Sequence, residues 1–421
     1  MRSPKEHQEL LKKYAEAVVR VGLNLRAGQR LIITNATSRG VPPPARPFVY
    51  EVTKAAYTAG ARFVDVIWGD EEMLRLRLQH APADSFDEYP KWMVHGILDI
   101  IKNGDALLSI YANDPDVYHG LASDRVATMQ KAHLENYQEI VVNVARNAMN
   151  WCIAAAAAPA WAAKIFPDLQ PEEAEEKLWQ AIFETTRATH PDPVAAWQEH
   201  IQNLKKRASY LQAKNFSALH YKSPNTDFTL GLARGHRWIS AQSLAENGIA
   251  FTANMPTEEV FTLPDRHRAE GTVTATFPLS YGGTLIEDFS VTFENGRIVK
   301  VNAKRNESIL QRLVDTDEGS TRLGEVALVP ASSPIAKRGH LFYNTLFDEN
   351  ASCHIAIGRG YRFTLTGGKE LTEEEFNAAG GNTSLNHVDF MIGSPQMDID
   401  GIREDGKREP VMRQGEWAFE V

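Results

Sequence analysis

Cysteine is scarce, because the 421-residue chain holds only Cys152 and Cys353. Two thiols so far apart in the sequence build neither a disulfide framework nor a CxxC metal site. Long apolar runs are also missing, since the longest, residues 151–163, is too short to span a bilayer and contains Pro159. The charged N-terminal segment MRSPKEHQELLKKY lacks the apolar stretch of a secretory signal. We therefore expect a cytoplasmic protein that makes no use of a membrane.

An excess of basic residues is missing as well. The chain has 54 acidic and 45 basic residues and a formal net charge of -9. Because binding to phosphates needs a basic face, nucleic acid is not expected as a partner. The hydrophobic fraction of 43% and charged fraction of 24% are typical of globular proteins and exclude a largely disordered or fibrous chain. The length predicts two to three domains, with two as the working number.

Strand-like and helical patterns alternate in the first half of the chain, as they do in a parallel sheet covered by helices. Residues 151–157 fit either state, and we favour a strand, while the role of the alanines at 154–158 stays open. The other expected strands are 30–34, 62–68, 107–111 and 139–144, and the expected helices are 5–25, 48–59, 171–189 and 193–214.

The pattern changes near residue 216, where short β-type runs begin. The pair Asn295-Gly296 predicts a hairpin turn, because both central residues of a type I′ turn need a positive φ. The expected fold class is therefore α/β, with an N-terminal α/β domain at 1–215 and a C-terminal α+β domain at 216–421. The strands expected in the second domain are 217–221, 228–232, 271–277, 284–293 and 297–303.

Carboxylates in two segments of the second half lie next to apolar residues. Glu258 and Glu259 are adjacent, so on a strand only one of them can face a given site; the alternative is one surface acid and one turn acid. Glu325 precedes the apolar run VALV and is either an ordinary edge acid or a partnered one, because an unpaired buried charge costs several kcal/mol.

Two histidines enter strand-like segments of the same half. His354 follows Glu349 by five residues and could be a core histidine or a metal ligand, whereas the adjacent Cys353 should point away from it. His387 and Asp389 are two residues apart, so their side chains share one face of a strand. They form either a hydrogen-bonded pair or two ligands of one metal.

The combination of acids and histidines is more informative than any one member. Carboxylate oxygen and imidazole nitrogen suit Zn²⁺, Co²⁺ or Mn²⁺ and do not suit an iron–sulfur cluster. Two metal ions about 3.5–4 Å apart need a bridging carboxylate and further ligands to each ion. Five such ligands would satisfy this requirement, and the domain at 216–421, which holds all of them, is expected to carry the metal site.

Several long sequence segments in the second half resemble the M29 family of metallo-aminopeptidases. They are NMPTEEVFTLPD (254–265), PLSYGGTLIEDFSVTFENGRIV (278–299), LVDTDEGSTRLGEVALVP (313–330), FYNTLFDENASCHIAIGRGY (342–361) and NTSLNHVDFMIGS (382–394). A weaker family segment, CIAAAAAPAWAAKIFP (152–167), lies in the first half.

This resemblance implies an aminopeptidase that hydrolyses N-terminal residues from peptides with two divalent metal ions, either Zn, Co, Mn or Mg. It also implies a homodimer. Glu325 would bridge the ions, Tyr361 would lie near the scissile carbonyl, and Glu258 or another uncoordinated acid would act as the base. The implied metal ligands are Glu259, with Glu258 as its alternative, and Glu325, Glu349, His354, His387 and Asp389.

Two rival functions use a similar set of residues. A mononuclear non-haem iron dioxygenase on a related fold would need two histidines and one carboxylate. A non-catalytic peptide- or metal-binding homologue could keep the scaffold, since fold does not dictate function. The complete set of carboxylates favours the two-metal hydrolase.

Overall fold

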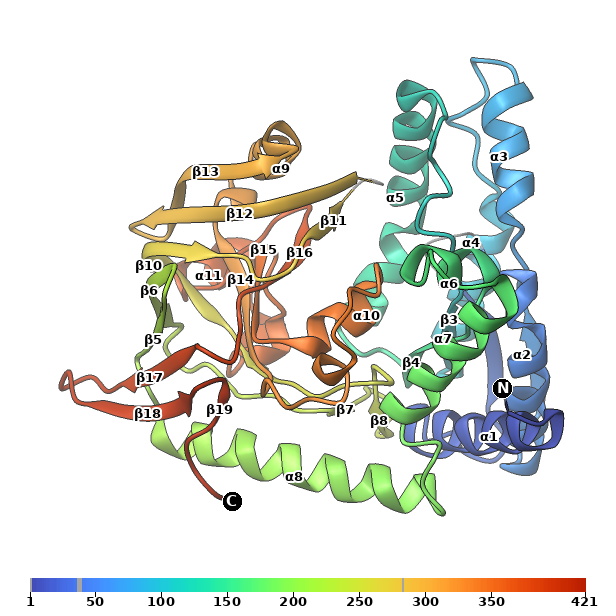
Figure 1. Cartoon of the computed structure of the whole chain (residues 1–421), viewed down its shortest axis with the longest axis horizontal. Helices are drawn as coiled ribbons and strands as arrows, with labels where there is room; N and C mark the ends of the chain where they lie inside the picture. The colour runs from blue at the N-terminus through green and yellow to red at the C-terminus, as the bar shows by residue number, and fades with distance from the viewer. Residues whose placement is uncertain (1, 36–39, 282–283) are drawn as a thin grey trace. The chain divides into compact units, whose positions relative to one another are not determined.

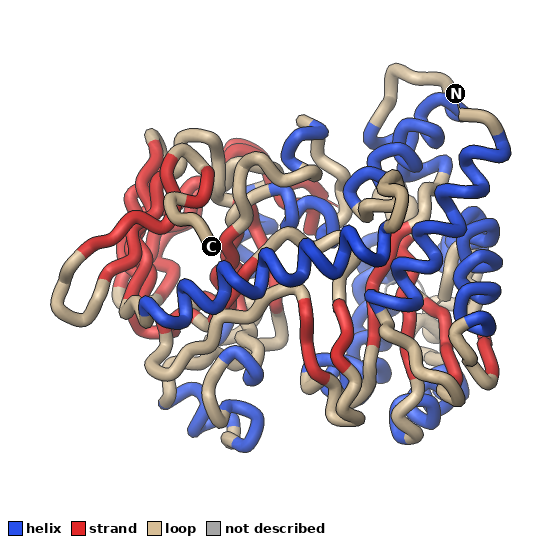
Figure 2. Tube along the Cα trace, turned by 90° about the horizontal axis from the view of Figure 1, so that it is seen from below, coloured by secondary structure: helices blue, strands red, loops and turns tan. Residues whose placement is uncertain are grey.

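A computed structural model describes residues 2–35, 40–281 and 284–421 of the chain. The chain separates into two compact units (Figure 1). The first runs to Glu199 and also takes in Gln242–Pro256, and the second holds His200–Ala241 and Thr257–Val421. The division at residue 199 lies inside helix α8 (Pro193–Lys214), which Figure 2 shows as one long helix. Domains at 1–215 and 216–421 stay a prediction.

The first unit contains a four-stranded parallel sheet in the order β2-β1-β3-β4. Its strands are β1 (Arg30–Thr34), β2 (Phe63–Val66), β3 (Ala106–Tyr111) and β4 (Trp151–Ala155), and β7 (Gln242–Leu244) pairs with β8 (Ala250–Thr252). Its helices are α1 (Pro4–Ala17) with the π-helical η1 (Val18–Gly22), η2 (Pro43–Ala45), α2 (Arg46–Thr58), α3 (Glu71–His80), α4 (Lys91–Lys102), α5 (Ser123–Ala145), α6 (Pro159–Ile165) and α7 (Pro171–Thr185).

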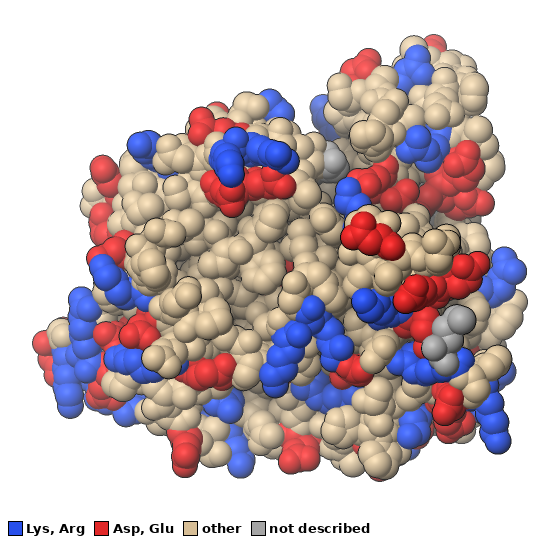
Figure 3. Space-filling view, viewed as in Figure 1, with Lys and Arg blue, Asp and Glu red and all other residues tan. Residues whose placement is uncertain are grey.

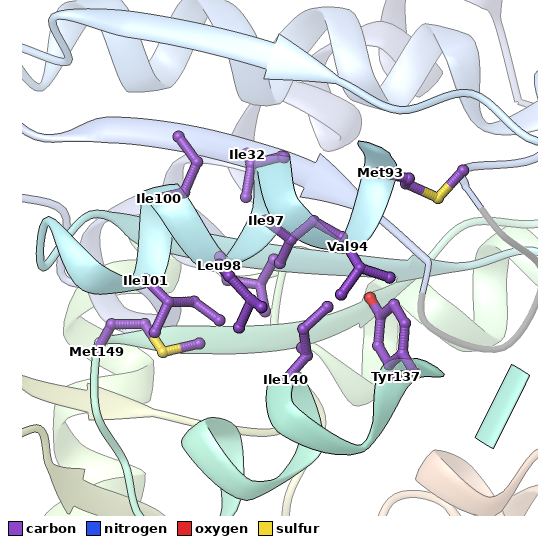
Figure 4. Close-up of a cluster of buried hydrophobic side chains, with 11 residues drawn as sticks. Ile32, Met93, Val94, Ile97, Leu98, Ile100, Ile101, Tyr137, Ile140 and Met149 are labelled. Atoms are coloured by element: carbon purple, nitrogen blue, oxygen red, sulfur yellow. The ribbon is translucent and has the colours of Figure 1, made fainter. Parts of the chain in front are cut away.

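Segment 139–144 is not a strand, and that prediction is wrong. It forms the last turns of α5, where Tyr137 and Ile140 point into a cluster with α4 and β3 (Figure 4). Val142 on the same helix is 50% exposed. The buried positions recur at helical spacing, so packing against α4 overrides the strand propensity of the β-branched run.

The alanines at 154–158 are buried beside α1, which answers the question left open above. The hydroxyl of Tyr14 accepts a hydrogen bond from the N–H of Ala155 at 3.0 Å and lies 3.1 Å from its carbonyl oxygen. Methyl side chains leave room for the Tyr14 ring to reach the backbone of β4. The small residues therefore permit close packing of a helix on the sheet.

The second unit is built from antiparallel sheets. One has nine strands in the order β11-β12-β10-β6-β5-β17-β18-β19, with β13 on β12, and the other has the order β16-β15-β14-β9. Its strands are β5 (Ala218–Ser223), β6 (Thr226–Leu232), β9 (Val260–Thr262), β10 (Pro264–Thr274), β11 (Leu279–Tyr281), β12 (Thr284–Glu294), β13 (Arg297–Arg305), β14 (Leu323–Leu328), β15 (His354–Gly358), β16 (His387–Met391), β17 (Asp398–Ile402), β18 (Arg408–Arg413) and β19 (Glu416–Trp417).

Short helices connect these strands. The α-helices are α9 (Glu307–Val314), α10 (Thr345–Asp348) and α11 (Glu373–Ala378), and the 3₁₀ turns are η3 (Gly319–Thr321), η4 (Ala336–Arg338), η5 (Glu349–Ala351), η6 (Arg362–Thr364) and η7 (Gly368–Glu370). The predicted hairpin joins β12 to β13, with φ angles of 50° at Asn295 and 77° at Gly296. The α/β fold class is confirmed.

Both acidic and basic side chains occur on the face drawn in Figure 3, as the near balance of charges in the sequence leads one to expect. Within the described ranges, no helix has the length and apolarity needed to cross a membrane.

Candidate metal centre

One face of the four-stranded sheet gathers the predicted ligands. Residues paired directly across antiparallel strands have side chains on the same face, and residues two apart on one strand share a face. His354 pairs with Ala327 on one side and with Met391 on the other. Ala356 pairs with both Glu325 and Asp389. The register of three strands therefore brings together side chains from residues 325, 354, 387 and 389.

The opposite face of this sheet is part of the core. Phe390 is fully buried and its ring packs against Phe289, with the centroids 5.4 Å apart. Cys353 also points away from the site, because its Sγ lies 3.3 Å from the carbonyl oxygen of Val329 and 3.5 Å from Sδ of Met412. Two predictions agree with this arrangement. His387 and Asp389 share one face of their strand, and Cys353 points away from His354.

Two groups of three side chains could each hold a metal ion in the described part of the chain. One is Glu259, Glu325 and His354, the other is Glu325, His387 and Asp389, and in each the ligand atoms lie within 4.8 Å of one another. Glu325 belongs to both groups: its Oε1 is 3.7 Å from Nε2 of His354 and its Oε2 is 3.9 Å from Nε2 of His387. The bridging role that the resemblance implies for Glu325 stays a prediction.

Both imidazoles are oriented by backbone carbonyls. Nδ1 of His354 donates to the carbonyl of Ser352 at 3.0 Å, and Nδ1 of His387 donates to the carbonyl of Arg359 at 2.7 Å. Each ring therefore turns Nε2 toward the carboxylates, at 3.1 Å from Glu259 and 3.4 Å from Asp389. A histidine fixed through one nitrogen so that the other is free to bind is the usual arrangement around a metal.

The carboxylates and imidazoles perturb one another strongly because they are buried together. Burial raises the pKa of Glu325 to about 7, and the charges of Asp389 and Glu259 add to the shift. Burial would lower the pKa of His354, but Glu259 and Glu325 outweigh it and raise it well above its ordinary value. Burial lowers the pKa of His387 as well, yet Asp389 and Glu325 raise it to about 9.

The donor set fits divalent cations. Among the described residues, none donates a hydrogen bond to the buried Oδ1 of Asp389. Glu259 and Glu325 are 7% and 5% exposed, and Glu325 lies close enough to both Glu259 and Asp389 for their negative charges to raise its pKa. Oxygen and imidazole ligands around concentrated negative charge are what Zn²⁺, Co²⁺ or Mn²⁺ would neutralise.

The adjacent acids Glu258 and Glu259 are both buried, so the alternative of one surface acid is wrong. They lie in an irregular segment just before β9 and have different partners. Glu259 meets His354, whereas Oε2 of Glu258 is 3.5 Å from Nε2 of His200 on α8. Glu258 is in neither group of three, and the geometry favours Glu259 as the ligand.

Glu349 lies on η5 and is also in neither group of three, although it is close enough to be affected by the ligand residues. Burial raises its pKa well above the ordinary value, and the charges of Glu259 and Asp389 raise it further. Tyr361 is near the same groups: its ring centroid is 4.8 Å from that of His387, and burial and the charge of Glu325 raise its pKa.

Two residues near the site were not predicted. His200 is on a helix outside all the sequence segments that resemble the family. Its contact with Glu258 joins residues that are 58 positions apart. Asn350 lies inside one such segment, and its Oδ1 accepts a hydrogen bond from the N–H of Glu258. A lone amide or imidazole carries no sequence signal for a contact of this kind, which only the fold creates.

Known proteins resemble this chain over nearly its whole length. The family described as thermophilic metalloprotease (M29) matches residues 7–417. The chain is 47% identical to aminopeptidase AmpS of Bacillus subtilis over 412 residues, which cover 97% of this chain and 98% of that protein. It is 46% identical to aminopeptidase T of Thermus thermophilus over 408 residues, which cover 97% and 98% of the two chains.

A solved structure, wild-type AmpT from Thermus thermophilus, superposes on this fold with a TM-score of 0.92 and 45% sequence identity, covering 99% of this chain and 100% of that one. The predicted resemblance is confirmed. The chain belongs to the thermophilic metalloprotease (M29) family.

Proposed function

We propose that this protein removes N-terminal residues from peptides at a pair of divalent metal ions bridged by Glu325. Its class, a metallo-aminopeptidase and thus a peptide hydrolase, follows from the family and from the relatives named aminopeptidase. The single observation that supports a two-metal centre is the position of Glu325 in both groups of potential ligands. Glu259 and His354 would complete one site, and His387 and Asp389 the other.

When bound, two bridged cations supply an activated water and polarise the scissile carbonyl. A carboxylate must then take the proton of the attacking water and deliver it to the leaving amine. Glu349 is the better candidate for this role than Glu258, because it lies among the ligand carboxylates while Glu258 contacts His200. The Tyr361 hydroxyl would donate a hydrogen bond to the oxyanion that forms on the carbonyl.

The alternative to this role as a base is that Glu349 binds a metal ion, as the family resemblance implies. The variant Glu349→Gln distinguishes the two roles, because it removes the proton acceptor but keeps an oxygen at the same position. A base predicts unchanged metal content with turnover reduced by about 10²–10⁴. A ligand predicts loss of bound metal together with turnover.

The choice of metal and the assembly are further parts of the proposal. We propose Zn, Co, Mn or Mg as the native ion, a homodimer in solution, and a cytoplasmic location. Peptides with a free N-terminus would be the substrates, because the α-amine could bind at the same centre as the scissile carbonyl. An iron dioxygenase and a non-catalytic homologue are set aside, since the family and its named relatives are peptidases.

The proposal is tested by elemental analysis of the purified protein together with peptides whose N-terminus is free or blocked. Dialysis against a strong chelator should abolish release of amino acids from free peptides, and Co²⁺, Zn²⁺ or Mn²⁺ should restore it. Glu325→Ala should lose both ions at once, because it removes the shared ligand. Full activity after complete removal of metal, or one ion retained with normal affinity by Glu325→Ala, would contradict the bridged centre.

A further inference from the structure

The segment that carries Glu259 lies outside the strand register that places the other ligands. Strand β9 pairs with β14 only from Val260 onward, where Val260 is opposite Leu328. Residues 257–259 belong to no helix or strand. The pairing of the sheet therefore begins one residue beyond Glu259, and other contacts must orient the backbone at this ligand.

The peptide group between Thr257 and Glu258 is bound by a side chain at each of its two polar atoms. Nε2 of His200 on α8 donates a hydrogen bond of 2.8 Å to the carbonyl oxygen of Thr257. Oδ1 of Asn350 accepts a hydrogen bond of 2.7 Å from the N–H of Glu258. In a trans peptide the carbonyl and the N–H point in opposite directions, so the two side chains hold this peptide group from opposite sides.

His200 also faces the carboxylate that follows this peptide group. Its Nε2 lies 3.5 Å from Oε2 of Glu258, and the two side chains are only 14% and 7% exposed. A carbonyl oxygen can only accept a hydrogen bond, so Nε2 of His200 must carry the proton and donate it. The negative charge of Glu258 attracts the same N–H group in these poorly hydrated surroundings, which helps to keep the ring against the peptide.

The orientation of this peptide group affects where Glu259 lies. Rotation of the peptide plane would change the backbone angles on both sides of it, and with them the direction in which the chain enters Glu259. The carboxylate of Glu259 must stay beside His354, whose Nε2 is 3.1 Å away. Residues that bind a metal ion need to be held within about 0.5 Å of their productive positions. A hydrogen bond to this backbone should therefore influence metal affinity.

We propose that His200 is a positioning residue of the candidate metal centre. Its hydrogen bond to the carbonyl of Thr257 orients the backbone that presents Glu259 to a metal ion. This inference rests on the proposed two-metal function. Glu259 belongs to the group of potential ligands that contains His354 and not to the group that contains Asp389. The affinity for only one of the two ions should therefore depend on His200.

Two substitutions of His200 separate the hydrogen bond from the bulk of the side chain. His200→Leu keeps apolar bulk without a donor, whereas His200→Gln keeps an N–H group that can reach the same carbonyl. Calorimetric titration of each metal-free protein with Co²⁺ measures the affinity for the two ions. His200→Leu should weaken one ion about tenfold, the order expected when a group that orients a ligand is lost, and the other by less than about threefold. His200→Gln should stay within about threefold of the wild type for both ions.

His236→Leu is the matched control. This imidazole is 3% exposed and belongs to the same unit, and its Nδ1 donates a hydrogen bond of 2.9 Å to the carbonyl of Ala233. The substitution removes an equivalent bond between a buried histidine and the backbone. It should therefore lower the melting temperature and leave both affinities for Co²⁺ as they are in the wild type.

Unchanged affinities in His200→Leu, an equal loss for both ions, or an equally weak His200→Gln would overturn the positioning role. A loss of the same size in His236→Leu would overturn it as well, because the effect would then come from lower stability. A wild-type protein that binds fewer than two Co²⁺ ions would instead refute the proposed two-metal centre, and this inference with it.

Discussion

Oδ1 of Asn350 accepts a hydrogen bond of 2.7 Å from the backbone N–H of Glu258 across 92 residues of sequence. Nδ2 of the same amide donates to the carbonyl of Leu346 at 3.0 Å, and the side chain is fully buried. One side chain thereby joins the segment that carries Glu259 to the short helices that carry Glu349. The two acids come from distant parts of the chain, and this amide helps to hold them at one site.

Asn350→Ala should therefore weaken metal binding as well as folding. Leaving the N–H of Glu258 buried without its acceptor should cost about 1–3 kcal/mol in the free energy of unfolding. Chemical unfolding of the metal-free protein and titration with Co²⁺ measure the two effects. Asn35→Ala is the control, because that buried amide donates to Ile110 and Asn113 in the other unit. Equal metal affinity in the two variants would exclude a positioning role.

Tyr361→Phe should lower kcat by about 10²–10³, the usual effect of losing one donor to an oxyanion. The ring and its contacts with Phe261 and Phe363 are kept, so KM and the bound metal should change little. Steady-state kinetics and elemental analysis of the same preparation check both statements. Tyr210→Phe, which removes a hydroxyl from the ring stacked on Phe419, should behave as the wild type. A reduction below about threefold in Tyr361→Phe would exclude the hydroxyl from catalysis.

Cys353→Ala should keep both metal binding and turnover, although the residue adjoins a proposed ligand. Its thiol is directed into the core, where burial raises its pKa to about 11, so it is neither exposed nor ionised near neutral pH. The expected effect is a loss of about 1 kcal/mol in stability from the small cavity left behind. Thermal unfolding and metal analysis provide the readout. Loss of metal with an unchanged fold would mean that the sulfur acts at the centre.

Glu409 should stabilise the folded protein at neutral pH and lose that effect in acid. Lys214 and Arg403, each 2.7 Å away, lower its pKa to about 2, whereas an unfolded glutamate has a pKa of about 4.3. Since the folded-state value is the lower one, the stabilisation is complete above about pH 5 and disappears as the pH falls toward 2.

The variant Glu409→Gln should accordingly have a lower melting temperature than the wild type at pH 7, and the two curves should converge as the pH approaches 2. Glu404→Gln, an exposed acid in the turn between β17 and β18, should follow the wild type throughout. A difference between Glu409→Gln and the wild type that is constant across the pH range would show that the charge is not responsible.

Much of the fold could be predicted because local patterns and burial agree. The alternation of His387, Val388, Asp389 and Phe390 predicts one polar and one apolar face, and β16 has both. Asn295-Gly296 predicts its hairpin for an equally local reason, the positive φ at both residues. The strand predicted at 139–144 is wrong because Ile140 packs with α4 as part of a helix, and no local signal in the β-branched run reports that packing.

The sequence by itself determined the family, the fold class and the residue types of the centre, since carboxylates and imidazoles in the family-like sequence segments already restrict the chemistry. Only the tertiary structure decided which carboxylate lies beside which histidine. Strand register sets Glu325 between two histidines, and an irregular segment turns Glu258 toward His200 and Glu259 toward His354. Distances of this kind depend on pairing between strands far apart in the chain, so neighbouring residues cannot encode them alone.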